Sequence, residues 1–70
     1  MQQNNPLRQL YIEHYSYLIR FARNFVNPDL AEDLVQETFL IAQKRLDSVL
    51  NSENPTGWLV NTLKNVIGNT

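Results

Sequence analysis

Apolar residues recur every three or four positions along three stretches of the chain, which is the period of an amphipathic α-helix. Each stretch follows an Asn-Pro pair, in which asparagine caps a helix and proline occupies its first turn. The pattern predicts helices over residues 7–25, 29–46 and 55–67. We therefore expect an all-α fold, a three-helix bundle whose apolar stripes meet in one core.

The stripes define the expected core. Its positions are Leu7, Leu10, Tyr11, Tyr15, Leu18, Ala22 and Phe25 in the first helix, Ala31, Val35, Phe39, Ala42 and Leu46 in the second, and Leu59, Leu63, Val66 and Ile67 in the third. Asp29 and Glu32 are spaced as an acidic analogue of a capping box at the start of the second helix. Residues 47–54, rich in polar side chains, are expected to form a loop long enough to carry function.

Composition narrows the class of protein. The chain has 70 residues with six Lys and Arg, seven Asp and Glu, one His and no Cys. One domain is expected over residues 1–70, because an average domain already takes ~100–150 residues. Without thiolates or several histidines we expect no metal and no cofactor. No apolar run approaches the ~20 residues that cross a bilayer, and no signal peptide is visible, so we expect a cytoplasmic protein without membrane contact.

Charge is distributed unevenly along the chain. Residues 29–53 hold six acidic and two basic residues, a balance of −4, whereas residues 1–28 hold three Arg and one Glu, a balance of +2. At ~100° per residue, one face of the second helix, opposite the core stripe, carries Asp33, Gln36, Glu37, Leu40 and Lys44. A leucine amid carboxylates is typical of a docking patch, in which the acids select a basic partner. A solvated helix face is the alternative.

The third predicted helix has a polar sector with Trp58, Asn61, Asn65 and Asn69, flanked by Lys64. Asparagine amides match the donor and acceptor pattern of base edges, and an aromatic ring can stack on a base. Ordinary surface asparagines, with a tryptophan that covers the core, explain the same pattern. One lysine supplies little phosphate binding.

Catalytic candidates are weak in this sequence. His14 has no neighbouring nucleophile pattern, and the carboxylates of the second helix lack the Glu-x-x-His motif of a di-metal bundle. No glycine-rich phosphate loop is present. We therefore expect a protein that is not an enzyme, with a small metal-dependent enzyme as the remaining catalytic alternative.

Two segments carry a family resemblance. The first reads Leu30-Ala-Glu-Asp-Leu-Val-Gln-Glu-Thr-Phe-Leu40, and the second reads Asn54-Pro-Thr-Gly-Trp-Leu-Val-Asn-Thr-Leu-Lys-Asn65. With residues 10–23 as a first helix, they resemble region 2 of bacterial RNA polymerase sigma factors, specifically the extracytoplasmic-function group. The resemblance extends over residues 7–69.

The resemblance implies a domain that docks on a coiled coil of the largest catalytic subunit of core RNA polymerase. It also implies recognition and melting of the minus-ten promoter element, mainly through the non-template single strand, with the loop 47–54 holding an extruded base. The expected polymerase-binding residues are Asp33, Gln36, Glu37 and Leu40, and the expected DNA-binding residues are Trp58, Asn61, Lys64, Asn65 and Asn69. An anti-sigma factor is a further candidate partner.

The chain departs from the family pattern in two places. Asn61 stands where the family usually has Arg, and the basic stretch that normally extends the third helix is missing after Gly68. Both departures weaken the expected phosphate binding. We expect a fragment of a longer protein that lacks the C-terminal region 4 domain. The alternative function is a sigma-like interaction module, a polymerase decoy or a partner-binding protein, that does not read a promoter.

Overall fold

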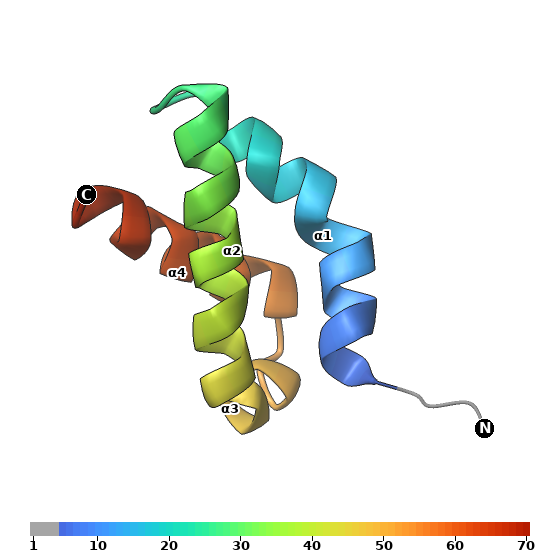
Figure 1. Ribbon diagram of the computed structural model, residues 1–70. Helices are drawn as coiled ribbons and strands as arrows, with labels where there is room; N and C mark the ends of the chain where they lie inside the picture. The colour runs from blue at the N-terminus through green and yellow to red at the C-terminus, as the bar shows by residue number, and fades with distance from the viewer. Residues whose placement is uncertain (1–4) are drawn as a thin grey trace.

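The computed structural model describes residues 5–70, and within them the chain forms four helices and no strand (Figure 1). Their bounds are Pro6–Ala22 for α1, Pro28–Lys44 for α2, Leu46–Leu50 for α3 and Pro55–Gly68 for α4. The all-α class predicted from the sequence is confirmed. The three predicted helices correspond to α1, α2 and α4, and the short helix α3 is an addition to them.

Each long helix starts at an Asn-Pro pair, as predicted. The side-chain oxygens of Asn5, Asn27 and Asn54 accept backbone N–H groups of the following turn at 2.8–3.3 Å. These bonds satisfy donors that the start of a helix otherwise leaves unpaired. Because Asn27 caps α2, the predicted capping pair of Asp29 and Glu32 is wrong.

The end of α1 lies earlier than predicted. The helix stops at Ala22 instead of Phe25, because the chain tightens into a turn in which the Phe25 N–H donates to the Ala22 carbonyl at 2.9 Å. Phe25 is 60% exposed, so its predicted place in the core is wrong. Its ring contacts that of Phe21 instead, with the two centroids 5.3 Å apart.

Helix α3 replaces the first half of the loop predicted over residues 47–54. Arg45, with φ −122° and ψ 39°, leaves the helical conformation and ends α2 at Lys44. The new helix carries a fully buried Val49 into the core. Burial of this side chain stabilises α3, although the polar composition of the segment predicts a loop. Only residues 51–54 remain as the connection to α4.

The core is one cluster of buried apolar side chains from all four helices. Its members are Leu10, Leu18, Ala22, Ala31, Leu34, Val35, Phe39, Ala42, Val49, Leu59 and Leu63. Among the other predicted core residues, those that are half-buried and pack against this cluster are Leu7, Tyr15, Val66 and Ile67. Leu46 is also half-buried.

The sequence pattern missed two buried positions of α2, Leu34 and Thr38. The Thr38 hydroxyl donates to the Leu34 carbonyl at 2.9 Å, which satisfies the buried oxygen inside the helix. Among residues 5–70 no buried side-chain polar atom lacks a hydrogen-bond partner. The polar side chains that are buried therefore do not destabilise this core through unsatisfied hydrogen-bonding groups.

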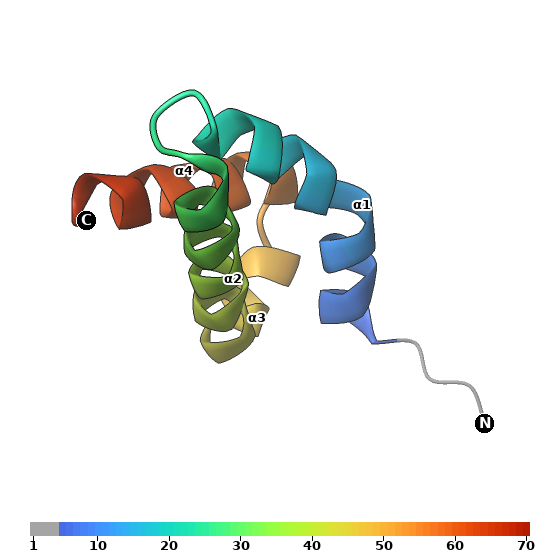
Figure 2. The same ribbon diagram turned by 45° about the horizontal axis from the view of Figure 1, so that its top comes forward.

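Helix α2 is the central element, in contact with both α1 and α4. Helices α1 and α2 are joined at one end and diverge toward the start of α1 and the end of α2 (Figure 1). Helix α4 crosses behind α2 in both views, and its last turns extend beyond the α1–α2 pair (Figure 2). The side of α2 that faces away from α4 is thus left for contacts outside the domain. Within residues 5–70, every helix is too short or too polar to traverse a bilayer.

Candidate interaction surfaces

Helix α2 presents an exposed acidic face with an apolar residue in it. We define the α2 outer face as Asp33, Gln36, Glu37 and Leu40, all of which are exposed. Leu40 is 53% exposed, while Val35, on the opposite side of the helix, is fully buried. The structure therefore brings the four predicted polymerase-binding residues together on one accessible surface.

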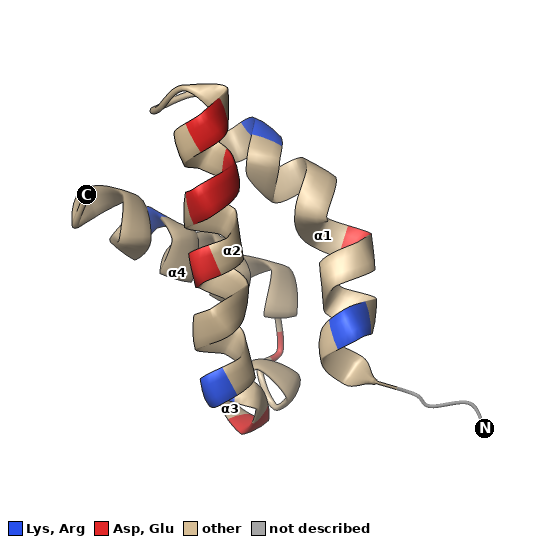
Figure 3. Cartoon of the chain, in the orientation of Figure 1, with Lys and Arg blue, Asp and Glu red and all other residues tan. Residues whose placement is uncertain are grey.

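The acidic residues of α2 lie between its first turn and its middle, and the last turn carries Lys44 (Figure 3). Negative charge is favourable in the first turn, which holds Asp29, because the unpaired N–H groups of a helix start create a positive potential. Exposed on the surface, the acidic residues form a negative patch that suits a basic partner.

Helix α4 presents a different kind of surface. Leu59 and Leu63 face the core, and the opposite side of the helix exposes Asn61, Lys64 and Asn65. Asn69 follows the helix, where its backbone N–H donates to the Asn65 carbonyl at 3.1 Å. Three amides and one ammonium group are therefore exposed along one side of α4.

Trp58 differs from the other predicted DNA-binding residues. It is half-buried and packs against the core cluster from the first turn of α4. Its backbone carbonyl accepts the Thr62 hydroxyl at 2.9 Å. The indole is consequently in part a core residue, and only its exposed part is accessible to a base.

The connection at residues 51–54 is tied to the start of α4. The backbone N–H of Asn54 donates to the Ser52 hydroxyl oxygen at 3.1 Å, and the Asn54 side chain accepts the Gly57 N–H at 3.0 Å. Gly57 makes this arrangement possible, because a Cβ at that position would stand 2.7 Å from Nδ2 of Asn54. The loop is therefore positioned by the same cap that starts the helix.

His14 has a structural role between α1 and α4. Its Nδ1 lies 3.0 Å from the Leu10 carbonyl oxygen, which can only accept, so Nδ1 carries the proton. Nε2 forms a hydrogen bond with the Thr56 hydroxyl at 2.8 Å. Both ring nitrogens are engaged in holding α4 against α1.

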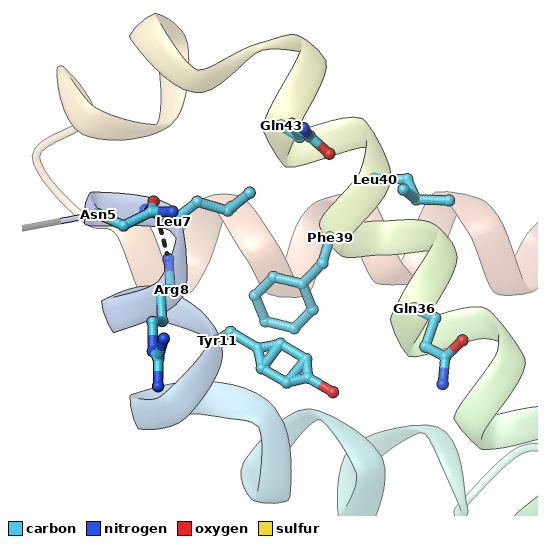
Figure 4. A pocket seen from close by; sticks show the side chains of 8 residues that line it. All are labelled: Asn5, Leu7, Arg8, Tyr11, Gln36, Phe39, Leu40 and Gln43. Atoms are coloured by element: carbon cyan, nitrogen blue, oxygen red, sulfur yellow. Dashed lines mark hydrogen bonds between the residues drawn. The ribbon is translucent and has the colours of Figure 1, made fainter. Parts of the chain in front are cut away.

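The structure also shows a groove that the sequence pattern did not predict. It lies between the first half of α1 and the second half of α2, has a volume of about 430 Å³, and is lined by Asn5, Leu7, Arg8, Tyr11, Gln36, Phe39, Leu40 and Gln43 (Figure 4). Tyr11, predicted to be core, is 38% exposed there. Its ring centroid lies 5.0 Å from that of Phe39. The signal in the sequence that could have indicated this groove is the recurrence of Gln36, Leu40 and Gln43 on one side of α2.

The described residues thus form an all-α domain with an exposed acidic surface on one helix and an exposed amide-rich surface on another. The family model for sigma-70 region 2 matches residues 10–69, and the chain belongs to this family. Comparison with curated proteins and with solved structures gives no match. Region 2 domains are non-enzymatic parts of sigma factors, the transcription-initiation proteins that bind core RNA polymerase and promoter DNA.

Proposed function

We propose that this chain is the region 2 domain of an extracytoplasmic-function sigma factor that acts in the cytoplasm. In this proposal the domain docks on core RNA polymerase, then recognises and melts the minus-ten promoter element. The observation that carries it is the α2 outer face, an exposed patch of two carboxylates, an amide and a leucine in a domain of this family.

The proposed docking partner is a coiled coil of the largest catalytic subunit. Asp33 and Glu37 attract basic side chains of that coiled coil, which steers association and makes it salt-dependent. Leu40 supplies the apolar anchor. Fully burying a leucine contributes about 1.5–3 kcal/mol, so covering its exposed half contributes roughly 1 kcal/mol. An anti-sigma factor is a candidate competitor for the same surface.

Charge reversal on the α2 outer face tests the docking proposal. Glu37→Arg or Asp33→Arg places a positive charge against a basic partner, and loss of a close charge pair costs about 2–5 kcal/mol, or roughly 30-fold or more in affinity. The matched control is Glu13→Arg, the same substitution at an exposed position of α1. The readout is the dissociation constant of the fluorescently labelled domain for core polymerase. Wild-type affinity in the Glu37→Arg variant would refute this role.

The proposed DNA-reading surface is the exposed side of α4 with the adjoining loop. The side-chain amides of Asn61, Asn65 and Asn69 offer donors and acceptors to unpaired bases, and the exposed part of Trp58 offers a stacking surface. Extruding a base costs a few kcal/mol, and least when the strand is already single. Residues 51–54 are the proposed cradle for that base.

Substitution on α4 tests the separation of the two surfaces. We expect Asn65→Ala to lower the rate of promoter opening, because the variant loses an amide that contacts a base, while the affinity for core polymerase stays unchanged. Asn24→Ala, at an exposed turn position after α1, is the control. Promoter opening is followed with a fluorescent base near the start site. Equal loss of core binding and promoter opening would contradict the proposal that α2 docks on polymerase and α4 contacts DNA.

One observation favours a second candidate function, a sigma-like decoy that occupies polymerase without reading a promoter. Lys64 is the one basic residue among residues 54–70, so the α4 surface gains little from phosphate contacts. Binding assays with core polymerase and single-stranded promoter oligonucleotides distinguish the two. A decoy binds core and confers no sequence preference, whereas a sigma domain confers one.

A further inference from the structure

A hydrogen bond between α1 and α4 lies at the start of the proposed DNA-reading helix. Nε2 of His14, in the middle of α1, is 2.8 Å from the hydroxyl oxygen of Thr56, in the first turn of α4. Among residues 5–70 it is the one side-chain hydrogen bond that joins two helices. The first turn of α4 is therefore held beside α1, whereas the last turns extend away from it (Figures 1 and 2).

The imidazole of His14 is itself held in one orientation. Its Nδ1 donates to the Leu10 carbonyl oxygen, one turn earlier in α1, at 3.0 Å, and this leaves Nε2 directed at Thr56. Both side chains of the pair are half-buried. A hydrogen bond weakens steeply when its angle changes, whereas the apolar contacts of a core residue such as Leu59 are non-directional. The pair therefore determines the position of the first turn of α4 more narrowly than core packing does.

The connection at residues 51–54 is attached between two anchored positions. Before it, Val49 of α3 is fully buried in the core, and after it, Thr56 is bonded to α1. Asn54 ties the connection to the same turn of α4, because its side chain caps that helix. A shift of Thr56 consequently moves the cap and the connection, together with Trp58, two residues further along the helix.

We propose that His14, through Thr56, is a positioning residue for promoter opening, which holds residues 51–54 and Trp58 where the extruded base is received. The inference rests on the proposed function. His14 contacts no DNA in this proposal, and it acts on the fraction of domains in which the first turn of α4 has the competent position. One hydrogen bond shifts such an equilibrium by roughly two- to tenfold, so its loss lowers the rate of opening by that factor. Core binding through the α2 outer face does not depend on this bond.

Removing the Thr56 hydroxyl tests this inference. Thr56→Val keeps the branched shape of the side chain and loses the bond, so we expect promoter opening to slow roughly two- to tenfold while the affinity for core polymerase stays unchanged. Thr56→Ser retains a hydroxyl and should open the promoter at close to the wild-type rate. The matched control is Thr62→Val, the same substitution in the same helix, where the hydroxyl bonds within α4. Opening is followed with a fluorescent base near the start site, at a temperature where circular dichroism shows every variant to be folded.

A double-mutant cycle tests whether His14 and Thr56 act as a pair. His14→Phe keeps a ring and loses both ring nitrogens, and its combination with Thr56→Val should slow opening no further than the slower single variant does. Fully additive losses would contradict the pair. If Thr56→Val weakens core binding as much as it slows opening, the bond supports only the general stability of the domain, and the positioning role is overturned.

The outcomes separate this inference from the proposed function. If Asn65→Ala slows opening while Thr56→Val opens the promoter at the wild-type rate, the positioning role is overturned and DNA contact by α4 stands. If neither variant slows opening, both proposals are overturned. Hydrogen exchange of the Gly57 amide in the free domain gives a second readout, because the Asn54 cap accepts that N–H. Faster exchange in Thr56→Val than in Thr62→Val supports a displaced cap, and equal exchange in the two variants contradicts it.

Discussion

Tyr15 shows how one half-buried residue makes stability depend on pH. Burial raises the pKa of its hydroxyl above the ordinary 10.0, and the neighbouring Tyr11 and the Glu32 carboxylate raise it further. The folded state thus disfavours tyrosinate more than the unfolded state does. This contribution to stability is complete below pH ~10 and is lost as pH rises through the higher folded pKa.

The corresponding prediction compares two tyrosines. Tyr15→Phe should lose less unfolding free energy than wild type between about pH 9 and pH 11, because phenylalanine does not ionise. Tyr17→Phe, at a 46% exposed position of the same helix, should follow the wild-type slope. Urea unfolding followed by Trp58 fluorescence provides the measurement. Identical slopes for all three proteins would contradict the assignment.

Individual residues were predictable where their environment is set by their own helix. The exposure of Asp33 and Glu37 and the burial of Val35 follow from helical period alone. Phe25 was wrongly placed in the core because its helix ends three residues earlier. Thr38 was missed because its burial depends on an internal hydrogen bond to the Leu34 carbonyl, which a hydrophobic pattern does not detect.

At the scale of the helices, the two glycines of α4 differ in the space that surrounds them. Gly57 leaves room for the Asn54 cap, whereas nothing lies within 4 Å of a Cβ added at Gly68. We expect Gly68→Ala to raise the unfolding free energy by up to ~1 kcal/mol, because alanine favours the helix. Gly57→Ala should gain less or lose stability, because displacing an asparagine cap costs about 1 kcal/mol. Thermal unfolding compares them, and equal stabilisation would show that the cap is not displaced.

All three predicted helix starts, and the end of the third helix, were predictable to within a residue or so, whereas the first two helices end earlier than predicted. Each start is fixed locally by an asparagine cap and a following proline, for example Asn27 and Pro28. The ends depend on contacts with other elements. Helix α3 forms where Val49 finds a place in the core, and its partners in that core come from the other helices. The loop that the sequence predicted over eight residues is therefore reduced to residues 51–54.

At the scale of the whole molecule, the two proposed surfaces belong to different helices that share one core. The α2 outer face and the exposed side of α4 are both positioned by packing against the cluster that contains Val35 and Leu63. In the proposed function, the packing of α4 behind α2 lets the domain dock and contact DNA at the same time (Figures 1 and 2). The period of each helix predicts these two surfaces, but the groove depends on how α1 and α2 diverge, which no single-helix pattern contains.

The central claim is that the α2 outer face is the surface by which this domain holds RNA polymerase. The most direct measurement is the dissociation constant of the Glu37→Arg variant for core polymerase, set beside those of wild type and Glu13→Arg. We predict a loss of roughly 30-fold or more for Glu37→Arg and none for Glu13→Arg. Equal affinity of all three proteins, with all three folded, would contradict the account.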